Sequence, residues 1–293
     1  MMADLTSLQP GPLRDLPYRV AWRARGVQAG AHRGRIAGPG GLFRDLTTLL
    51  EAPDPRRLDL RASARDPFEQ LYVRRFEQTT AITIYALVDV SASMGFVGNM
   101  RKMETAAAIC AALAFSAGRI GDSFGLIGCD SDIVPELHLP AMRSRGRAAM
   151  VASALVAFRP RRRGAGGLVQ AAARIAGRRK LVLLISDFQI EAGELDAVFE
   201  AVSPHDTLPI QLIDSGELAS LPRWGFLPIE DLETGRRRLV MLRPSLKAAW
   251  ERARAEHDAR LSALAARYAH PPFRIVDRID WDRLGARLME ARR

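Results

Sequence analysis

Oxygen-bearing side chains alternate directly after an apolar segment in the first third of the chain. Asp89, Ser91 and Ser93 stand in the motif DVSASMG (89–95), which follows the apolar run AITIYALV (81–88). Oxygens at this spacing can converge on one small, hard cation, and Mg²⁺ takes about six oxygen ligands, several of them from water. A structural role stays open beside this one, because the serines can cap a turn or helix while Asp89 accepts hydrogen bonds from backbone amides.

A second carboxylate follows another apolar segment further along the chain. Asp187 comes directly after KLVLLIS (180–186), so we expect it at the same edge of a parallel sheet as Asp89. Two aspartates at neighbouring strand ends repel each other unless a cation or a hydrogen-bond donor lies between them. Because the available ligands are all oxygens, the set favours Mg²⁺ or Mn²⁺ over zinc. The sequence therefore predicts a divalent-metal site formed by Asp89, Ser91, Ser93 and Asp187.

Alternating strand and helix patterns must position these residues. From residue 81 onward, unbroken apolar runs predict buried strands, and helical spacing predicts helices between them. Strands are expected at 81–89, 123–130, 133–139, 180–186 and 207–214, and helices at 101–119, 144–157, 167–177 and about 191–202. This order predicts an α/β fold with a doubly wound, mainly parallel sheet that is flanked by helices.

The chain is expected to have three regions. Residues 1–17 are a flexible lead-in that is rich in proline and polar residues. Residues 18–80 mix short extended pieces with Gly/Pro turns and predict a small, mainly β N-terminal module. Residues 81–293 form the α/β domain, which is expected to include a hairpin at 226–242 turning at Thr234 and Gly235, and a long helix at 245–269.

The composition indicates a globular, cytoplasmic protein. Hydrophobic residues make up 48% of the chain and charged residues 26%. The sequence contains no run of eighteen apolar residues, which a membrane-spanning helix would need. Its N-terminus lacks the features of a secretory signal. Cys110 and Cys129 lie in apolar segments and are expected in the core, and two cysteines are too few for a thiolate metal site.

The chain is strongly basic, with a net charge of +10 and an isoelectric point of about 10.6. Three of its 43 basic residues are lysines, which leaves 40 arginines. This bias is consistent with a GC-rich coding sequence or with a surface that attracts polyanions. Its densest run contains Arg159, Arg161, Arg162 and Arg163. The run is either a solvated loop or a rim that contacts an anion or an acidic partner beside the predicted metal site.

Four segments resemble one protein family. DVSASMG (89–95) and LLISDF (183–188) resemble the first and third loops of the metal-ion-dependent adhesion site of von Willebrand factor A (vWA) domains. Upstream, PDPRRLDLRASAR (53–65) and LYVRRFE (71–77) resemble a signature that precedes the vWA domain in a widespread bacterial family named for a domain of unknown function. The resemblance covers roughly residues 18–215. Members of that family often accompany MoxR-type AAA+ ATPases, and MxaS-like members are linked to methanol dehydrogenase maturation.

The sequence departs from the family pattern at two positions. A vWA site usually takes a threonine from its second loop, in a stretch similar to GGTxL, whereas the corresponding GAGGL (164–168) has Gly166 at that position. Leu60 stands where the family commonly has tryptophan. Without the threonine hydroxyl, a metal would bind weakly through Asp89, Ser91, Ser93, Asp187 and water, or the site would be vestigial.

The resemblance implies a non-enzymatic interaction or adaptor protein. In vWA sites, an aspartate or glutamate of the partner completes the coordination of the metal. The ATPase would supply force, and this chain would recognise a client for assembly, metal insertion or activation. Two alternatives stay open, a metal-dependent hydrolase and a basic nucleic-acid-binding protein. The chain has no P-loop, G-x-S-x-G or H-E-x-x-H motif, and no aromatic-basic binding motif is apparent.

Overall fold

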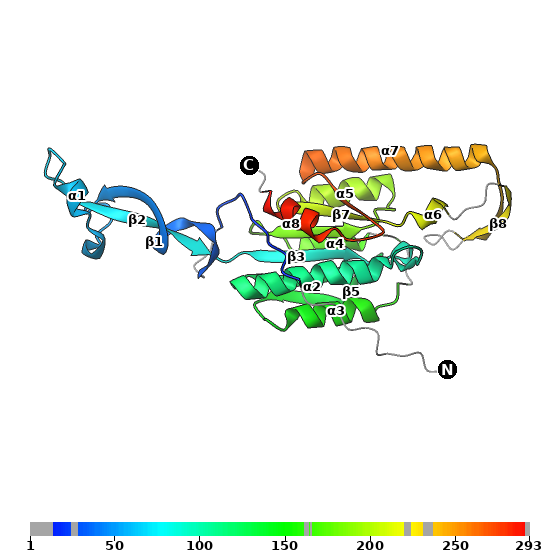
Figure 1. Cartoon of the computed structure of the whole chain (residues 1–293), viewed down its shortest axis with the longest axis horizontal. Helices are drawn as coiled ribbons and strands as arrows, with labels where there is room; N and C mark the ends of the chain where they lie inside the picture. Colours follow the sequence, from blue (N-terminus) through cyan, green and yellow to red (C-terminus); the bar gives the residue numbers. More distant parts are fainter. Residues whose placement is uncertain are drawn as a thin grey trace. The chain divides into compact units, whose positions relative to one another are not determined.

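The chain divides into two units. The computed structural model describes residues 14–24, 29–160, 164, 166–219, 224–230 and 237–290. We call residues 20–82 the ribbon unit, and residues 1–19 and 83–292 the sheet unit. The elements are labelled in Figure 1.

The ribbon unit is built on two antiparallel strands, β1 (Ala29–Thr48) and β2 (Tyr72–Thr80). Between them lie η2 (Pro55–Arg57) and α1 (Leu60–Ser63). Asp59 caps α1 by accepting the amides of its first turn, and it also accepts a hydrogen bond from Arg74 Nε at 2.7 Å. The two upstream family segments are therefore joined by an ion pair. Leu60, at the position where tryptophan is common, is exposed.

The sheet unit has the doubly wound α/β fold that the sequence predicts. Its strands lie in the order β10-β7-β6-β3-β4-β5, and neighbours are parallel except for β4 and β5. Numbered along the chain, this is the order 3-2-1-4-5-6 of a doubly wound sheet. The strands are β3 (Thr83–Asp89), β4 (Ser123–Cys129), β5 (Ile133–Met142), β6 (Leu181–Ser186), β7 (Asp206–Ile213) and β10 (Phe273–Val276).

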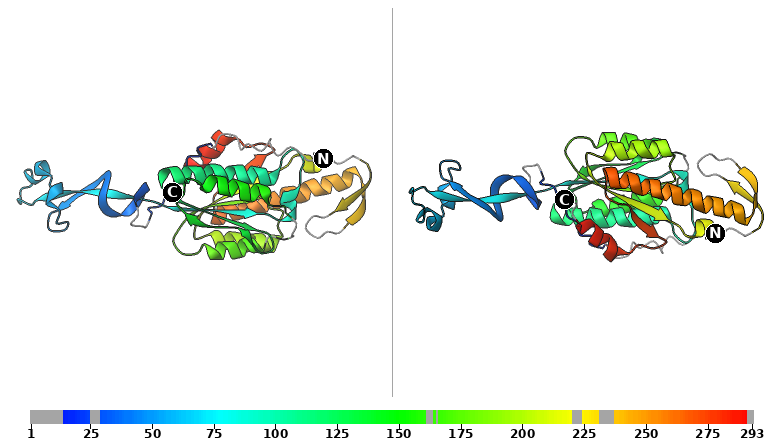
Figure 2. Two further views of the ribbon diagram at one scale, coloured as in Figure 1. Left: turned by 90° about the horizontal axis from the view of Figure 1, so that it is seen from below. Right: turned by 90° about the horizontal axis from the view of Figure 1, so that it is seen from above.

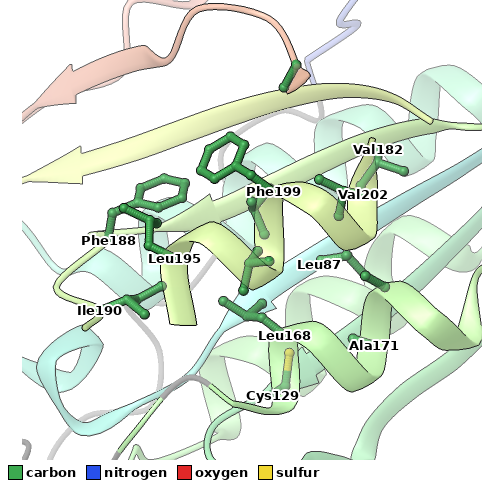
Figure 3. Close-up of a cluster of buried hydrophobic side chains, with 14 of the residues drawn as sticks. Leu87, Cys129, Leu168, Ala171, Val182, Phe188, Ile190, Leu195, Phe199 and Val202 are labelled. Atoms are coloured by element: carbon green, nitrogen blue, oxygen red, sulfur yellow. The ribbon is translucent and has the colours of Figure 1, made fainter. Parts of the chain in front are cut away.

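Helices cover both faces of this sheet, as Figure 2 shows. One face carries α4 (Gly167–Arg174), α5 (Ala192–Val202) and α7 (Pro244–Tyr268). Their apolar side chains pack on β3, β4 and β6 in one cluster, part of which is drawn in Figure 3. The other helices are α2 (Lys102–Ile120), α3 (Arg147–Ala157), α6 (Gly216–Ala219) and α8 (Trp281–Met289).

Helix α2 lies against the sheet and packs beside α3. By length and composition α2 is apolar enough to cross a membrane, but most of it is buried inside the unit. Such burial is typical of a core helix in a globular domain. Cys110 of α2 and Cys129 of β4 are both buried free cysteines, as the sequence predicts, and burial raises their pKa values.

A two-stranded hairpin follows α6 in the chain. It consists of β8 (Gly225–Glu230) and β9 (Arg237–Leu242), which pair antiparallel with Phe226 opposite Met241. The predicted hairpin is therefore confirmed, while its predicted turn at Thr234 and Gly235 lies outside the described residues. Helix α7 starts directly after the hairpin with a proline at its first position, where the missing amide costs no hydrogen bond.

A buried histidine at the start of β7 predicts that acid lowers the stability of the protein. His205, directly before β7, is 4% exposed, and among the described residues its Nδ1 atom has no hydrogen-bond partner. Burial, together with the charge of Lys180, lowers the pKa of His205 from 6.5 to about 4. The unfolded chain therefore binds this proton more tightly than the folded protein. The contribution of neutral His205 to stability is fully present above the pKa of the unfolded chain. It is lost as the pH falls toward the pKa of His205 in the folded protein.

We expect the free energy of unfolding to fall by about 2 kcal/mol between about pH 7 and pH 4 because of this residue. The His205→Gln variant should lose that component of the pH dependence. Urea denaturation of both proteins across this pH range measures it. An identical slope in the two proteins would show that His205 does not carry the effect.

Candidate functional site

The carboxyl ends of three parallel strands meet at one edge of the sheet unit, which we call the carboxyl edge. β3 ends at Asp89, β6 ends at Ser186 with Asp187 directly after it, and Asp214 follows β7. All three carboxylates are buried. Doubly wound sheets bind their ligands at this edge, so it is the first place to look for a site.

The four predicted ligand residues lie together at the carboxyl edge. The Ser91 amide donates to Asp89 Oδ1 at 2.8 Å, and the hydroxyl oxygens of Ser91 and Ser93 are 3.2 Å apart. The Ser93 hydroxyl donates to Asp187 Oδ1 at 3.3 Å. Ser186 adds a hydroxyl that donates to Asp89 Oδ2 at 2.6 Å. Asp89 thus accepts a backbone amide, as the structural reading of the motif expects, within a hydrogen-bond network that spans two strands.

Asp187 is held in place by the turn that follows it. Phe188 has a backbone φ of 57°, which is unfavourable for a residue with a side chain. Its amide donates to the Ser186 hydroxyl at 2.7 Å, and its buried ring packs on Phe199 with the ring centroids 6.3 Å apart, as Figure 3 shows. This packing fixes the turn and so positions the Asp187 carboxylate.

A buried lysine completes the cluster. Lys102, the first residue of α2, has a side chain that is 0% exposed. Its ammonium lies 2.7 Å from Asp187 Oδ2 and 2.5 Å from Glu217 Oε1 in α6, and it donates to the backbone carbonyl of Ser93 at 3.3 Å. The ammonium also lies 5.9 Å from the centre of the Phe96 ring. A positive charge therefore contacts one of the predicted metal ligands, the Asp187 carboxylate.

Asp214 positions the loop from which Lys102 enters the site. Its carboxylate accepts the amides of Asn99 and Met100 at 3.1 Å each, and that of Gly216 at 2.8 Å. Burial acts to raise the pKa of Asp214, but these amides hold it below its usual value. The ionised carboxylate thus ties the start of α2 to the start of α6, which carry Lys102 and its partner Glu217.

The site has an unusual distribution of charge. Burial raises the pKa of Asp89 to about 7, and the charge of Asp187 adds to this, while hydrogen bonds from neighbouring serines act in the opposite direction. Burial alone would lower the pKa of Lys102, but Asp187 and Glu217 outweigh it and raise that pKa above its usual value. Lys102 is therefore a lasting cation in this site.

The predicted arginine rim is described only in part. Arg159 is exposed, and its guanidinium donates to the carbonyls of Val156 and Phe158 at the end of α3. The next residue, Pro160, lies against Gly95 of the loop after β3, so this segment passes the carboxyl edge. Arg161, Arg162 and Arg163 lie outside the described residues. The rim therefore stays a prediction.

Gly166 stands directly before α4, beside the loop that follows β4. A Cβ atom built there would lie 3.4 Å from the carbonyl oxygen of Ser131, which is an ordinary van der Waals distance. The φ of Gly166 is −56°, which any residue can adopt. The missing threonine is therefore not excluded by the backbone.

Mg²⁺ or Mn²⁺ is the ion that the vWA resemblance implies at this site. The oxygen donors are close together, but the Lys102 ammonium is bonded to the Asp187 carboxylate that would hold the ion and to the backbone carbonyl of Ser93, whose hydroxyl would hold it. A divalent ion beside a buried ammonium would be strongly repelled. With Lys102 in this position, the residues present do not fit a divalent ion. Among the described residues, no three His, Cys, Asp or Glu side chains are grouped to hold a metal either.

Four residues of the cluster escaped the sequence analysis: Lys102, Ser186, Asp214 and Glu217. Asp214 had a usable signal, because it follows the apolar run TLPIQLI (207–213) as Asp187 follows its own strand. Lys102 had a weaker one, since it is one of only three lysines among 43 basic residues. The lysine ammonium is a compact charge, whereas the arginine guanidinium is planar and delocalised. Glu217 had no signal, because it reaches the site from a short helix outside the motifs.

Comparison with known proteins places this chain among bacterial proteins of related sequence. A family described as "Protein of unknown function DUF58" matches residues 53–260. An uncharacterized protein of Mycobacterium tuberculosis is 26% identical over 252 residues, which cover 84% of this chain and 78% of that protein. An uncharacterized protein in the moxR 3′ region of Paracoccus denitrificans is 38% identical over 97 residues, covering 33% of this chain and 92% of that protein.

Among solved structures, BatB from Bacteroides thetaiotaomicron is similar to this chain at 13% sequence identity and a TM-score of 0.45. The match covers 71% of this chain and 96% of BatB. The family match confirms the resemblance that the four sequence segments indicate. It spans most of the chain, including both upstream segments and both strand-end motifs, and this protein therefore belongs to the DUF58 family.

Proposed function

We propose that this protein is a non-enzymatic interaction module that works with a MoxR-type AAA+ ATPase in the cytoplasm. Its task would be the assembly, metal insertion or activation of a client protein complex, with methanol dehydrogenase maturation as one candidate process. Two findings support an adaptor role: the vWA-type fold of the sheet unit, and the relative in a moxR 3′ region. The ATPase would hydrolyse ATP, and this chain would supply recognition.

The observation that carries the proposal is an exposed apolar face on the hairpin. Phe226 and Met241 are directly opposite each other, and Leu239 lies two residues from Met241, so all three share one face of the two-stranded ribbon. Phe226 is 67% exposed and Leu239 is 70% exposed. Exposed apolar patches of this kind mark protein–protein contacts. The hairpin follows α6 in the chain and lies at the same end of the sheet unit as α6, as Figure 1 shows.

We assign the hairpin face to the ATPase and the carboxyl edge to the client. The net charge of +10 would attract an acidic client, and Arg159, Arg161, Arg162 and Arg163 would line the path of its carboxylate. In the form that the vWA resemblance implies, a divalent ion held by Asp89, Ser91, Ser93 and Asp187 would bind an aspartate or glutamate of the client. The position of Lys102 points to a different cation.

Binding of the purified chain to the MoxR-type ATPase of the same organism tests the proposal. We expect the double substitution Phe226→Ser and Leu239→Ser to weaken binding by at least about tenfold, because large apolar anchors dominate such interfaces. The fold should be unchanged, since both side chains are exposed. Biolayer interferometry gives the affinity, and circular dichroism checks the fold.

The matched control replaces two exposed apolar residues elsewhere in the sheet unit, Met142→Ser and Met150→Ser. It should bind the ATPase like the wild type. An equal loss in both variants would mean that the effect is not specific to the hairpin. If affinity purification from the native cell recovers nucleic acid in a salt-sensitive way and no ATPase, the proposed function is wrong.

A further inference from the structure

The Lys102 ammonium has the bonding pattern of a bound cation. A lysine ammonium carries three N–H donors and no acceptor. Three oxygens lie around this one: a carboxylate oxygen of Asp187, a carboxylate oxygen of Glu217 and the backbone carbonyl of Ser93. Every donor therefore has an acceptor, although the side chain is fully buried. A buried charge is tolerated when it is paired and hydrogen-bonded in this way.

One of the three oxygens around the Lys102 ammonium belongs to Asp187, a predicted ligand of the divalent ion. Asp187 offers one oxygen to Lys102 and the other to the Ser93 hydroxyl, so the carboxylate already links the ammonium to the serine network. Glu217 also pairs with Arg254 at 3.6 Å. The two carboxylates that contact the ammonium are thus already neutralised by two basic side chains of the chain itself. These two carboxylates therefore have no unpaired negative charge to offset the two positive charges of a divalent ion.

The chain also lacks one ligand that a metal-binding vWA site takes from its second loop, because Gly166 has no hydroxyl. The same sequence therefore has a missing metal ligand and a covalently attached cation at one site. A site with a resident ammonium does not need the threonine, and a site without the threonine would hold an ion poorly.

We infer that Lys102 is the cation of this site, and that the carboxyl edge is organised by its ammonium without a divalent metal ion. The chemistry of the inference stands on the contacts of Lys102, while its part in client recognition rests on the proposed function. The cation is then permanent, so recognition at this edge would be insensitive to chelators. An acidic group of the client would be bound by side chains at the rim and not by a metal.

Titration of the purified full-length protein with Mn²⁺, followed by electron paramagnetic resonance, tests this inference. Four proteins are compared: the wild type, Gly166→Thr, Lys102→Ala with Gly166→Thr, and the same double variant with Asp187→Asn. Gly166→Thr restores the family hydroxyl but keeps Lys102, and so is the matched control. We expect no saturable binding of Mn²⁺ by the wild type or by Gly166→Thr at millimolar concentration.

The double variant should bind one Mn²⁺ per chain more than tenfold tighter than the control, and Asp187→Asn should abolish that binding. If the double variant does not fold in the absence of metal, its binding of Mn²⁺ is tested by refolding it with Mn²⁺ or with EDTA. Folded protein is then expected only with Mn²⁺. A wild-type protein that binds one Mn²⁺ and loses it with Asp187→Asn would overturn the inference. So would a double variant that gains no site, or that fails to fold in both buffers. Loss of ATPase binding alone would count against the proposed function and not against this inference.

Discussion

Replacing Lys102 by methionine is expected to lower the free energy of unfolding by about 3–5 kcal/mol, because it leaves the buried Asp187 carboxylate without its counter-charge and Glu217 with Arg254 alone. Methionine fills a similar volume, so the loss reports the charge and not a cavity. Asp187 is 2% exposed and Glu217 16%, and neither can regain full hydration in the folded protein. Urea denaturation at about pH 7, followed by circular dichroism, measures the change.

Two controls separate this effect from a general cost of losing a lysine. Lys247→Met removes a partly exposed lysine from α7 that does not belong to the Lys102 cluster, and should change the stability by less than about 0.5 kcal/mol. Adding Asp187→Asn to Lys102→Met removes part of the unpaired charge and should recover some of the lost stability. A loss below about 1 kcal/mol for Lys102→Met would mean that the ammonium does not stabilise the cluster as its contacts indicate.

The raised pKa of Asp89 predicts a second large effect, on the pH dependence of stability. Its sign is opposite to that of an ordinary aspartate. Burial and the charge of Asp187 raise its pKa from 3.8 to about 7. The folded protein therefore binds this proton more tightly than the unfolded chain. The corresponding stability is fully present below about pH 4 and is lost as the pH rises through 7. Ionised Asp89 thus destabilises the fold at alkaline pH.

We expect Asp89→Asn to gain about 3 kcal/mol of stability relative to the wild type when the pH is raised from about 4 to about 8. The side-chain carbonyl oxygen of asparagine can also accept a hydrogen bond from the Ser91 amide, but it carries no charge. Urea denaturation of both proteins at the two pH values measures the difference. Asp282→Asn, at an exposed position of α8, is the control and should follow the wild type. A constant difference between Asp89→Asn and the wild type would contradict the raised pKa.

The strand-end motifs made part of the site predictable. Asp89, Ser91 and Ser93 are consecutive alternate residues after one strand, and Asp187 directly follows another. Parallel strands with right-handed crossovers bring such ends to one edge, so the spacing within each motif and the order of elements predict that they meet. The structure shows the Ser93 hydroxyl bonded to Asp187, 94 residues away in the chain. The positions of these four residues needed no tertiary information beyond the fold class.

Lys102 could not be placed in the same way. A helix with charged residues in its first turn is typical of a solvated helix end, and Lys102 stands beside Arg101, which is exposed. The loop between β3 and α2 is held by Asp214, directly after β7, which accepts the amides of Asn99 and Met100 just before Lys102. No periodicity reports such a contact, because it depends on a single side chain.

The sequence by itself determined the family, the doubly wound sheet and the four oxygen-bearing residues at its edge, because hydrophobic periodicity and strand-end motifs are local properties of the chain. Only the tertiary structure shows that the Lys102 ammonium contacts two of those residues, Ser93 and Asp187. Lys102 meets Asp187 from 85 positions away and is enclosed with it out of water. Whether a site is filled by an ion or by the chain's own ammonium depends on burial and on the balance of charge within a few ångströms. These quantities exist only after distant segments have packed together.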